Sequence, residues 1–295
     1  MTTQTDFQAR RRRGIGGSDV AAIAGLNPWK TPLQVWKEKV LGDTVEENAA
    51  MRWGTKLEPV ILEAYGEEMK ATVVQAAPVL DGYKMAHADG IAMFDDRRHI
   101  IEVKTSRTDK GWGQPGSDEV PDHYACQGQW YLARYGLDRV DFAVLVGASD
   151  FRIYSQPRLQ TVIDNLERLA EKFWNENVLK EVPPDPVTSA EAAEVWRKTT
   201  GRSVVLPDDV LVALRNREVW KAQVKELEAQ IEAAELTIKT TLRDNEAGTS
   251  ADGAVVCTWK PQVSQRLDTA RFKREMPDLY ENYSNRFENR VLRVK

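Results

Sequence analysis

The sequence predicts a mixed α/β (α+β) protein: a central mixed sheet flanked by helices, then a C-terminal extension with a long coiled-coil-like helix and a small β element. Two patterns carry this prediction. Apolar and polar residues alternate with period two between residues 72 and 105, which is typical of strands. Apolar residues recur at helical spacing over 48–68, 121–135 and 159–182. A length of 295 residues is enough for one large domain or two modest ones.

The N-terminal part is predicted to be helical after a basic arm at residues 1–13. Ser18 is the expected N-cap of a short first helix, and Pro32 is well placed in the first turn of a second helix. The three expected helices cover residues 18–26, 31–42 and 48–68.

The middle of the chain predicts the sheet and its remaining helices. The expected strands cover residues 72–79, 83–87, 90–94, 99–105, 140–147 and 151–155. A loop at 106–120 precedes a helix that Pro121 opens and Gly136 closes. A further helix is expected over 159–182.

The run Pro183-Pro184-Asp185-Pro186 is the clearest boundary in the sequence. The predicted domains are therefore the arm at 1–13, a core at 14–186 and an extension at 187–295. A helix over 208–244 carries apolar residues at alternating spacings of four and three, which predicts a coiled-coil-like seam. The seam residues are Trp220, Val224, Leu227, Ile231, Ala234, Ile238 and Thr241. A strand at 255–260, a helix at 269–275 and a strand at 287–294 are expected after it.

Composition excludes several classes of protein. Two cysteines, Cys126 and Cys257, exclude a disulfide framework and a four-cysteine zinc or iron–sulfur site within one chain. The apolar runs are too short to span a bilayer and the N-terminus lacks a signal-peptide core, so a cytoplasmic location is expected. The net charge is −4, yet Arg10–Arg13 and the basic segment from Lys260 to Lys295 permit an anionic polymer as partner.

The stretch from Asp89 to Lys104 is the strongest candidate for chemistry. Glu102 and Lys104 are two residues apart on an expected strand, so their side chains project from one face, and Asp89 lies between two strands. Two carboxylates and a backbone carbonyl suffice for Mg²⁺, and a lysine facing the cation is suited to activating or orienting a water. The alternative is a solvated ion pair, because Glu-x-Lys is common on amphipathic strands.

Other polar and aromatic positions have both a functional and a structural interpretation. Glu58, at the edge of an apolar helix face, is either a third acid or a boundary glutamate. Gln127 either holds a nucleophile or phosphate oxygen, or is a helix-capping or core-edge amide. His87 shares the strand face of Asp89 and is either a ligand or a structural histidine. Trp112, between two glycines, either stacks on bases or packs its loop on its own domain.

Gly16-Gly17-Ser18 precedes a helix, and Arg11 lies seven residues before Ser18. Backbone N–H groups at a helix N-terminus, a hydroxyl and an arginine together form a natural phosphate site. Many helices begin in this way, so the segment alone is weak evidence. The neighbouring arginines Arg10, Arg12 and Arg13 compete with Arg11 for the assignment.

In this order, these segments resemble the family of YqaJ-type viral recombinase nucleases and bacteriophage lambda exonuclease. That family belongs to the restriction-endonuclease-like superfamily, so the resemblance implies a restriction-endonuclease-like core. It covers about residues 10–180. The matching motifs are Arg13-Gly14-Ile15-Gly16-Gly17-Ser18-Asp19 with Asn27-Pro28-Trp29, Trp53-Gly54-x-x-x-Glu58, Asp89-Gly90, Glu102-Val103-Lys104 and Tyr124-x-x-Gln127.

The resemblance implies roles for these residues. Asp89, Glu102 and the Val103 carbonyl would hold Mg²⁺, with Mn²⁺ as a substitute and two ions in the site, and Lys104 would position or activate the attacking water. Glu58 would be an additional acid near the metals.

Two further roles follow from the same resemblance. Gln127 would help to hold the nucleophile or Lys104. Arg11 and Ser18 would bind the 5′-phosphate end of the substrate strand.

The implied activity is hydrolysis of linear double-stranded DNA from its 5′ end, leaving 5′-phosphate products. The resemblance also implies phage-type recombination in a bacterial cytoplasm, with a single-strand annealing protein as partner and a homotrimer as the assembly. Lambda exonuclease lacks a matching extension, which leaves ring geometry open. Arg286, Arg290 and Arg293 on the last expected strand would either grip duplex DNA or form a solvated surface. An endonuclease on the same core and a non-catalytic DNA-binding scaffold are the alternatives.

Overall fold

The computed structural model describes residues 11–44, 46–285 and 290–294. The chain divides into two compact units, unit 1 up to Val195 and unit 2 from Trp196 onward. Each unit is described by itself. No helix within the described ranges has both the length and the apolar character needed to cross a bilayer.

The sequence predicted a boundary between residues 186 and 187, directly after the proline-rich run, whereas the two units of the structure divide between Val195 and Trp196. Helix α7 (Ser189–Val195) follows that run and belongs to unit 1. Its Glu191 side chain is buried and accepts hydrogen bonds from Thr31 Oγ1 and from the backbone N–H of Val187. Buried polar contacts of this kind keep the segment after the prolines on unit 1.

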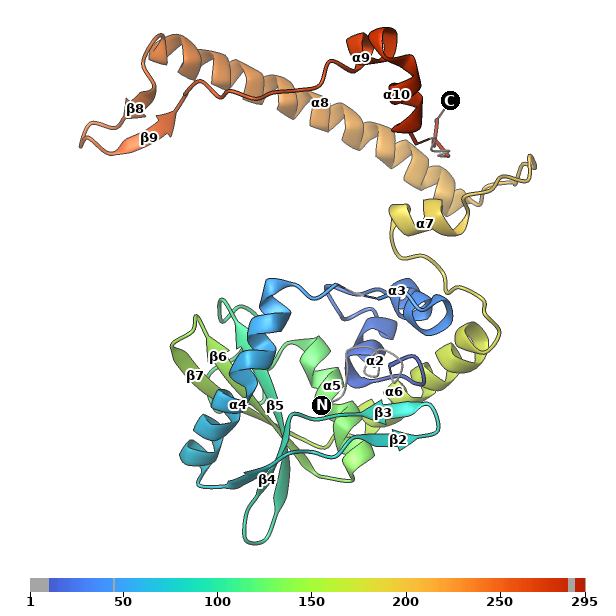
Figure 1. The fold of residues 1–295 in the computed structure, drawn as a ribbon, viewed down its shortest axis with the longest axis vertical. Helices are drawn as coiled ribbons and strands as arrows, with labels where there is room; N and C mark the ends of the chain where they lie inside the picture. The colour runs from blue at the N-terminus through green and yellow to red at the C-terminus, as the bar shows by residue number, and fades with distance from the viewer. Residues whose placement is uncertain (1–10, 45, 286–289, 295) are drawn as a thin grey trace. The chain divides into compact units, whose positions relative to one another are not determined.

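The centre of unit 1 is a five-stranded mixed sheet, which confirms the predicted fold class (Figure 1). The strand order is β1-β4-β5-β6-β7; β5 and β6 are parallel and the other neighbours are antiparallel. The strands are β1 (Thr72–Val74), β4 (Gly90–Met93), β5 (Arg98–Ser106), β6 (Arg139–Val146) and β7 (Asp150–Pro157).

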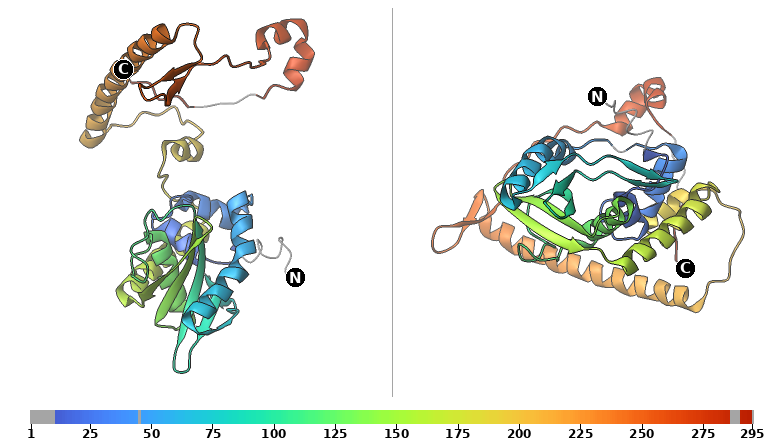
Figure 2. Two further views of the ribbon diagram at one scale, coloured as in Figure 1. Left: turned by 90° about the vertical axis from the view of Figure 1, so that its left-hand side faces the viewer. Right: turned by 90° about the horizontal axis from the view of Figure 1, so that it is seen from below.

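Helices cover both faces of this sheet (Figures 1 and 2). Helix α4 (Ala49–Met69) lies on one face and α5 (Asp122–Tyr135) on the other, with α2 (Gly17–Ile23) and α6 (Gln160–Phe173) packed against α5. Consecutive residues of β5 therefore enter different cores. Ile101 packs with Tyr65 on the α4 side, whereas Ile100 packs with Trp130 of α5.

Helix α5 follows the sequence prediction closely. It begins after Pro121 and ends at Gly136, which adopts a left-handed conformation with φ 63°. Gly128 lets this helix approach the sheet, because a Cβ atom there would lie 2.9 Å from the Phe142 ring. The close approach brings the α5 side chains directly over β5 and β6.

The predicted cap of the first helix is wrong. The N-cap of α2 is Gly16, and the Asp19 carboxylate accepts a hydrogen bond from the Gly16 N–H at 3.1 Å. Ser18 lies within the first turn, and the helix ends at Ile23 rather than Leu26. An aspartate at the third helical position provides the acceptor that the pattern assigned to Ser18.

The second helix and its end are as expected. Thr31 Oγ1 caps α3 (Pro32–Trp36), which continues into a π-helical segment η1 (Lys37–Leu41) and stops at Gly42 with φ 80°. The apolar repeat over 48–68 predicts that Trp53, Val60 and Ile61 all face inward, and only part of this holds. Trp53 and Val60 are exposed, and Ile61 and Tyr65 are the buried residues of that helix.

The predicted strand at 72–79 is two separate strands. After β1 the chain leaves the main sheet at Gln75, and Pro78, which cannot donate to a ladder, precedes β2 (Val79–Asp81). Strand β2 pairs with β3 (Lys84–Ala86) in a two-stranded sheet. The helix expected over 159–182 also ends earlier, because α6 passes into a π-helical segment η2 (Trp174–Val178).

Unit 2 is built around α8 (Asp208–Leu242), a single helix of 35 residues that confirms the prediction over 208–244. A hairpin of β8 (Ala247–Thr249) and β9 (Val255–Thr258) follows, and then α9 (Thr269–Glu275) and α10 (Pro277–Asn282). Strand β8 and helix α10 were not predicted. Residues 290–294 have no regular structure, which contradicts the expected last strand over the part of 287–294 that is described.

A buried polar network ties α4 to the sheet. Asp141 of β6 accepts hydrogen bonds from Tyr65 at 2.5 Å, Arg139 at 2.9 Å and Ser155 at 2.6 Å, and its Oδ2 lies 2.8 Å from His99 Nδ1. Burial alone would raise the pKa of Asp141, but these partners outweigh it and lower the pKa to about 2. The network fixes α4, and therefore every side chain that α4 presents at the sheet edge.

Acid is expected to destabilise unit 1 through Asp141. Because its folded pKa is below the usual value of 3.8, its contribution is complete above about pH 4 and is lost as the pH falls towards 2. The shift corresponds to about 2 kcal/mol of unfolding free energy. Guanidinium unfolding between pH 2 and 6 should therefore show a smaller pH dependence in Asp141→Asn than in the wild-type chain. An equal acid dependence in both proteins would contradict this assignment.

Candidate active site

The site lies where β4 begins at the edge of β5. Gly90 pairs with Ile101, so Asp89, one residue before β4, lies opposite Glu102. Asp89 Oδ2 accepts a hydrogen bond from the Val103 N–H at 2.7 Å. The N–H and C=O of one strand residue point to the same side, so the Val103 carbonyl faces the Asp89 side as well. A carboxylate and a backbone oxygen are thus brought to one edge.

Glu102 and Lys104 project from the opposite face of β5 to Val103, towards α5. Lys104 Nζ donates to Glu102 Oε2 at 2.8 Å, and the Glu102 side chain is 1% exposed. The alternative interpretation, a solvated ion pair, therefore does not fit this burial. Burial raises the pKa of Glu102, although Lys104 opposes this effect. Burial disfavours the Lys104 ammonium, but Glu102 and Asp89 outweigh it and raise the pKa of Lys104.

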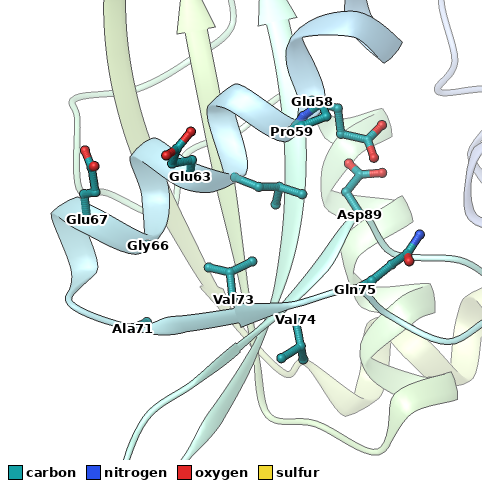
Figure 3. Close-up of a pocket in the computed structure, with 11 residues that line it drawn as sticks. Glu58, Pro59, Glu63, Gly66, Glu67, Ala71, Val73, Val74, Gln75 and Asp89 are labelled. Carbon is teal, nitrogen blue, oxygen red and sulfur yellow. The ribbon is translucent and has the colours of Figure 1, made fainter.

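Glu58 approaches Asp89 from helix α4. The two carboxylates face each other in Figure 3, and burial together with the Asp89 charge raises the pKa of Glu58. Of the two interpretations, the structure therefore places Glu58 beside the other acids. A pocket opens here between α4 and β1. It is lined by Glu58, Pro59, Leu62, Glu63, Gly66, Glu67, Ala71, Val73, Val74, Gln75 and Asp89.

The α5 side of the site is aromatic. The Tyr124 ring lies 5.0 Å from Lys104 Nζ, which is a cation–π contact. Gln127 Nε2 donates to the Tyr131 hydroxyl at 3.2 Å, and Tyr131 lies close enough to Glu102 for that charge to raise its pKa further after burial. Gln127 therefore contacts Tyr131, and the structure gives it no hydrogen bond to Lys104.

The N-terminal segment of the site is organised by Asp19. This buried carboxylate accepts hydrogen bonds from Lys30 at 2.7 Å and Lys39 at 2.6 Å, and Arg11 Nη2 lies 3.7 Å away. Ser18 is the adjacent residue of α2, so Arg11 and Ser18 are held near one helix N-terminus.

The competing arginines are placed differently. Arg12 is directed to the Val40 carbonyl at 3.5 Å, Arg13 is exposed, and Arg10 lies outside the described residues.

Trp112 packs on its own domain. Its ring stacks on Tyr124 with centroids 5.5 Å apart and lies 4.9 Å from the Tyr154 ring. The expectation that it stacks on bases is therefore not supported, and its contact with Tyr124 makes it a support for the residue that covers Lys104. His87 is exposed, which does not fit a structural histidine, one of its two interpretations.

The site offers a divalent cation only a few protein oxygen atoms. Among residues 11–44, 46–285 and 290–294, no group of three His, Cys, Asp or Glu side chains is arranged to hold a metal. Mg²⁺ needs fewer protein ligands, because it keeps several waters and is bound by one or two carboxylates. Glu102 Oε1 is buried with no hydrogen-bond partner in the described part of the chain. This oxygen, Asp89 and the Val103 carbonyl form an oxygen donor set that fits Mg²⁺.

Comparison with known proteins finds a matching family and a related sequence. A model of the YqaJ-like viral recombinase domain matches residues 6–138. The uncharacterized protein YqaJ of Bacillus subtilis (strain 168) is 31% identical over 293 residues, covering 95% of this chain and 90% of that protein. The chain belongs to the YqaJ-like viral recombinase family.

Solved structures are similar to part of this YqaJ-family chain. An alkaline exonuclease (LHK-Exo) from Laribacter hongkongensis is 23% identical, with a TM-score of 0.48, over 61% of this chain and 94% of that one. A phage-related exonuclease from Haemophilus somnus 129PT is 17% identical, with a TM-score of 0.41, over 57% of this chain and 96% of that one.

The three C-terminal arginines of the YqaJ-family chain do not form a basic strand in the described residues. Arg286 lies outside them. Arg290 donates to the Trp196 carbonyl at 2.8 Å within unit 2, and Arg293 lies in a segment without regular structure. Of the two arginines that the structure describes here, neither Arg290 nor Arg293 lies on a strand.

The sequence assigned no role to three residues beside the site, although two of them belong to the matching motifs. The Asp19–Lys39 pair was not predicted because it depends on a contact across 20 residues. Trp29 is 70% exposed, and its ring lies edge-on to His123, 5.0 Å between centroids. His123 in turn contacts Tyr124. Asn27-Pro28 was the available signal, since Asn27 Oδ1 accepts from the Trp29 N–H and fixes that turn.

Proposed function

We propose that this protein is a metal-dependent deoxyribonuclease, an exonuclease that hydrolyses linear double-stranded DNA from the 5′ end. The observation that carries the proposal is the convergence of Asp89, Glu102 and Lys104 at one sheet edge in a chain of a viral recombinase family. A buried lysine between two carboxylates is expensive for stability alone, because desolvation offsets the gain from pairing. A catalytic role would explain why these charged side chains are buried together.

Asp89, Glu102 and the Val103 carbonyl would hold Mg²⁺, or Mn²⁺ in its place, with Glu58 opposite Asp89 for a second ion. When bound, the ions would stabilise negative charge on the phosphate that is attacked. Lys104 is held by Glu102 at 2.8 Å and by the Tyr124 ring, so its remaining N–H groups can orient a water or a phosphate oxygen.

Arg11 and Ser18 would receive the 5′-phosphate. Ser18 precedes Asp19 in the first turn of α2, and the Asp19 carboxylate lies 3.7 Å from Arg11 Nη2. Gly17 brings this turn against α5, where a Cβ atom would lie 2.8 Å from Gln127 Cγ. The 5′ end of the DNA strand would then be bound by α2, next to the elements that carry the hydrolytic residues. This arrangement would give digestion in the 5′-to-3′ direction.

Linear duplex DNA with 5′-hydroxyl ends is expected to be digested about tenfold more slowly than the same duplex with 5′-phosphates, because one charge-assisted contact is lost. Initial rates on the two substrates measure this difference. Arg11→Gln should slow only the phosphorylated substrate, whereas Arg12→Gln serves as the matched control. Equal rates on both ends by the wild-type protein would remove the phosphate pocket from the proposal.

The direct test is digestion of linear duplex labelled separately at each end, with Mg²⁺ and with a chelator. The expected result is loss of the 5′ label first, as mononucleotides carrying 5′-phosphate, and no product with the chelator. Covalently closed circular DNA is expected to stay intact. Nicking of the circle would show that the same residues form an endonuclease and not an exonuclease. Product formation in the presence of the chelator would exclude metal dependence.

The proposal extends to recombination. Digestion of one strand leaves a 3′-ended single strand, and membership in a viral recombinase family supports a single-strand annealing protein as the partner that receives it. The cellular setting would be the cytoplasm of a bacterial host. The ring-shaped trimer implied by the lambda exonuclease resemblance stays a prediction.

A further inference from the structure

Helix α8 has an apolar stripe that the described residues of unit 2 leave exposed. Five of its seven seam residues are large apolar residues that are between 47% and 59% exposed, although the seam recurs at the alternating spacings of a coiled coil. These residues are Trp220, Val224, Leu227, Ile231 and Ile238. A 35-residue helix, about 50 Å long, with such a stripe is typical of a helix that pairs with another.

We propose that α8 pairs with α8 of a second copy of the chain as an antiparallel two-stranded coiled coil. In the heptad repeat, Val224 and Ile231 occupy a positions, whereas Trp220 and Leu227 occupy d positions. Antiparallel packing sets an a residue of one helix against a d residue of the other. The two central layers then join Val224 to Leu227 of the second copy, and the next layers join Trp220 to Ile231.

The outer layers match large side chains with small ones in this register. Arg217 lies opposite Ala234 of the second copy, and Ala213 lies opposite Ile238. Each pairing leaves room for the longer side chain, as close packing requires. A parallel pair in register would instead set Arg217 against Arg217 across the seam, which buries two like charges.

The residues that flank the seam also favour the antiparallel arrangement. In such a pair e positions face e positions, so Lys221 lies beside Glu228 of the second copy, and the twofold axis repeats this contact. A parallel pair sets g positions against e positions. It would bring Gln223 to Glu228 and Asn216 to Lys221, with no opposite charges. Charge complementarity therefore selects both the partner and its direction.

Cross-linking tests the direction of the pair in the full-length chain. Cys257→Ser removes the half-buried native thiol. Arg217→Cys and Ala234→Cys chains, produced together with different tags, should be joined to each other by a short bis-maleimide. Ala234→Cys alone should not self-link, because its two copies would be about 25 Å apart. Self-linking of Ala234→Cys would show a parallel pair and overturn the proposal, as would the absence of any linking.

Charge exchange tests the partner independently. Sedimentation equilibrium of Lys221→Glu is expected to show a pair about tenfold weaker than wild type, because both copies of the contact become repulsive. Lys221→Glu with Glu228→Lys should restore the wild-type affinity. Lys225→Glu makes the same charge change on the outer face and serves as the matched control. Equal affinities for all four proteins would overturn the pairing. So would a wild-type chain in which unit 1 or another protein covers α8 in place of a second copy.

Discussion

Lys104→Ala is expected to reduce DNA hydrolysis by about a thousandfold or more while the protein still binds duplex DNA. General acid–base and positioning groups contribute roughly 10²–10⁴-fold to the rate of an enzyme. Lys104 is the buried ammonium of this site, held 2.8 Å from Glu102 and covered by Tyr124. Alanine provides no donor that could replace it. Initial rates on linear 5′-phosphorylated duplex in Mg²⁺, and a binding titration in a chelator, measure the two properties separately.

Lys84→Ala is the matched control for this variant, because Lys84 is also ion-paired in unit 1, to Glu167, but stands on β3 away from the acids. It should retain the wild-type rate. Removal of Lys104 leaves Glu102 buried without its partner, so a thermal melt of each protein must accompany the rates. A folded Lys104→Ala protein that turns over near the wild-type rate would exclude the proposed site.

The sequence predicted those elements whose beginnings and ends are local. Pro121 and Gly136 enclose α5, and α8 follows its apolar repeat from Asp208 onward, because capping and periodicity depend on neighbours within a few residues. The Glu102/Lys104 pair was accessible for the same reason, since residues two apart on a strand share a face. The placement of Asp89 followed from strand order along the chain.

The missing parts depend on contacts between distant residues. Tyr65 and Asp141 are 76 positions apart, and no local pattern indicates that they share a hydrogen bond. The parallel pairing of β5 with β6 depends on the whole of α5 as a crossover. Ser18 was taken as an N-cap because serine is a common one, whereas Asp19 has the carboxylate that both caps the helix and neutralises Lys39.

Asp19→Asn is expected to destabilise unit 1 by roughly 3 kcal/mol, because removing one partner of a buried ion pair leaves the other charge uncompensated. Lys39 is fully buried, and Lys30 and Arg11 lie near the same carboxylate. Asparagine keeps the shape and one acceptor for the Gly16 N–H, so the loss measures charge. Guanidinium unfolding of the full chain gives the difference. Glu38→Gln, which removes the other carboxylate beside Lys30, is the matched control with a smaller expected loss.

The pH dependence of that difference separates charge from packing. Burial raises the pKa of Asp19, but Lys39, Lys30 and Arg11 outweigh it and lower the pKa below its usual 3.8, so the wild-type advantage is lost as the pH falls below about 4. Burial already lowers the pKa of Lys39, and the loss of the Asp19 charge lowers that pKa further. As the pH rises, Lys39 therefore loses its proton more readily in the variant, and the variant recovers stability. The gap should therefore be largest near neutral pH. A constant difference in unfolding free energy from pH 4 to 10 would assign the loss to packing. In that case the phosphate pocket beside Arg11 would not depend on the Asp19 charge.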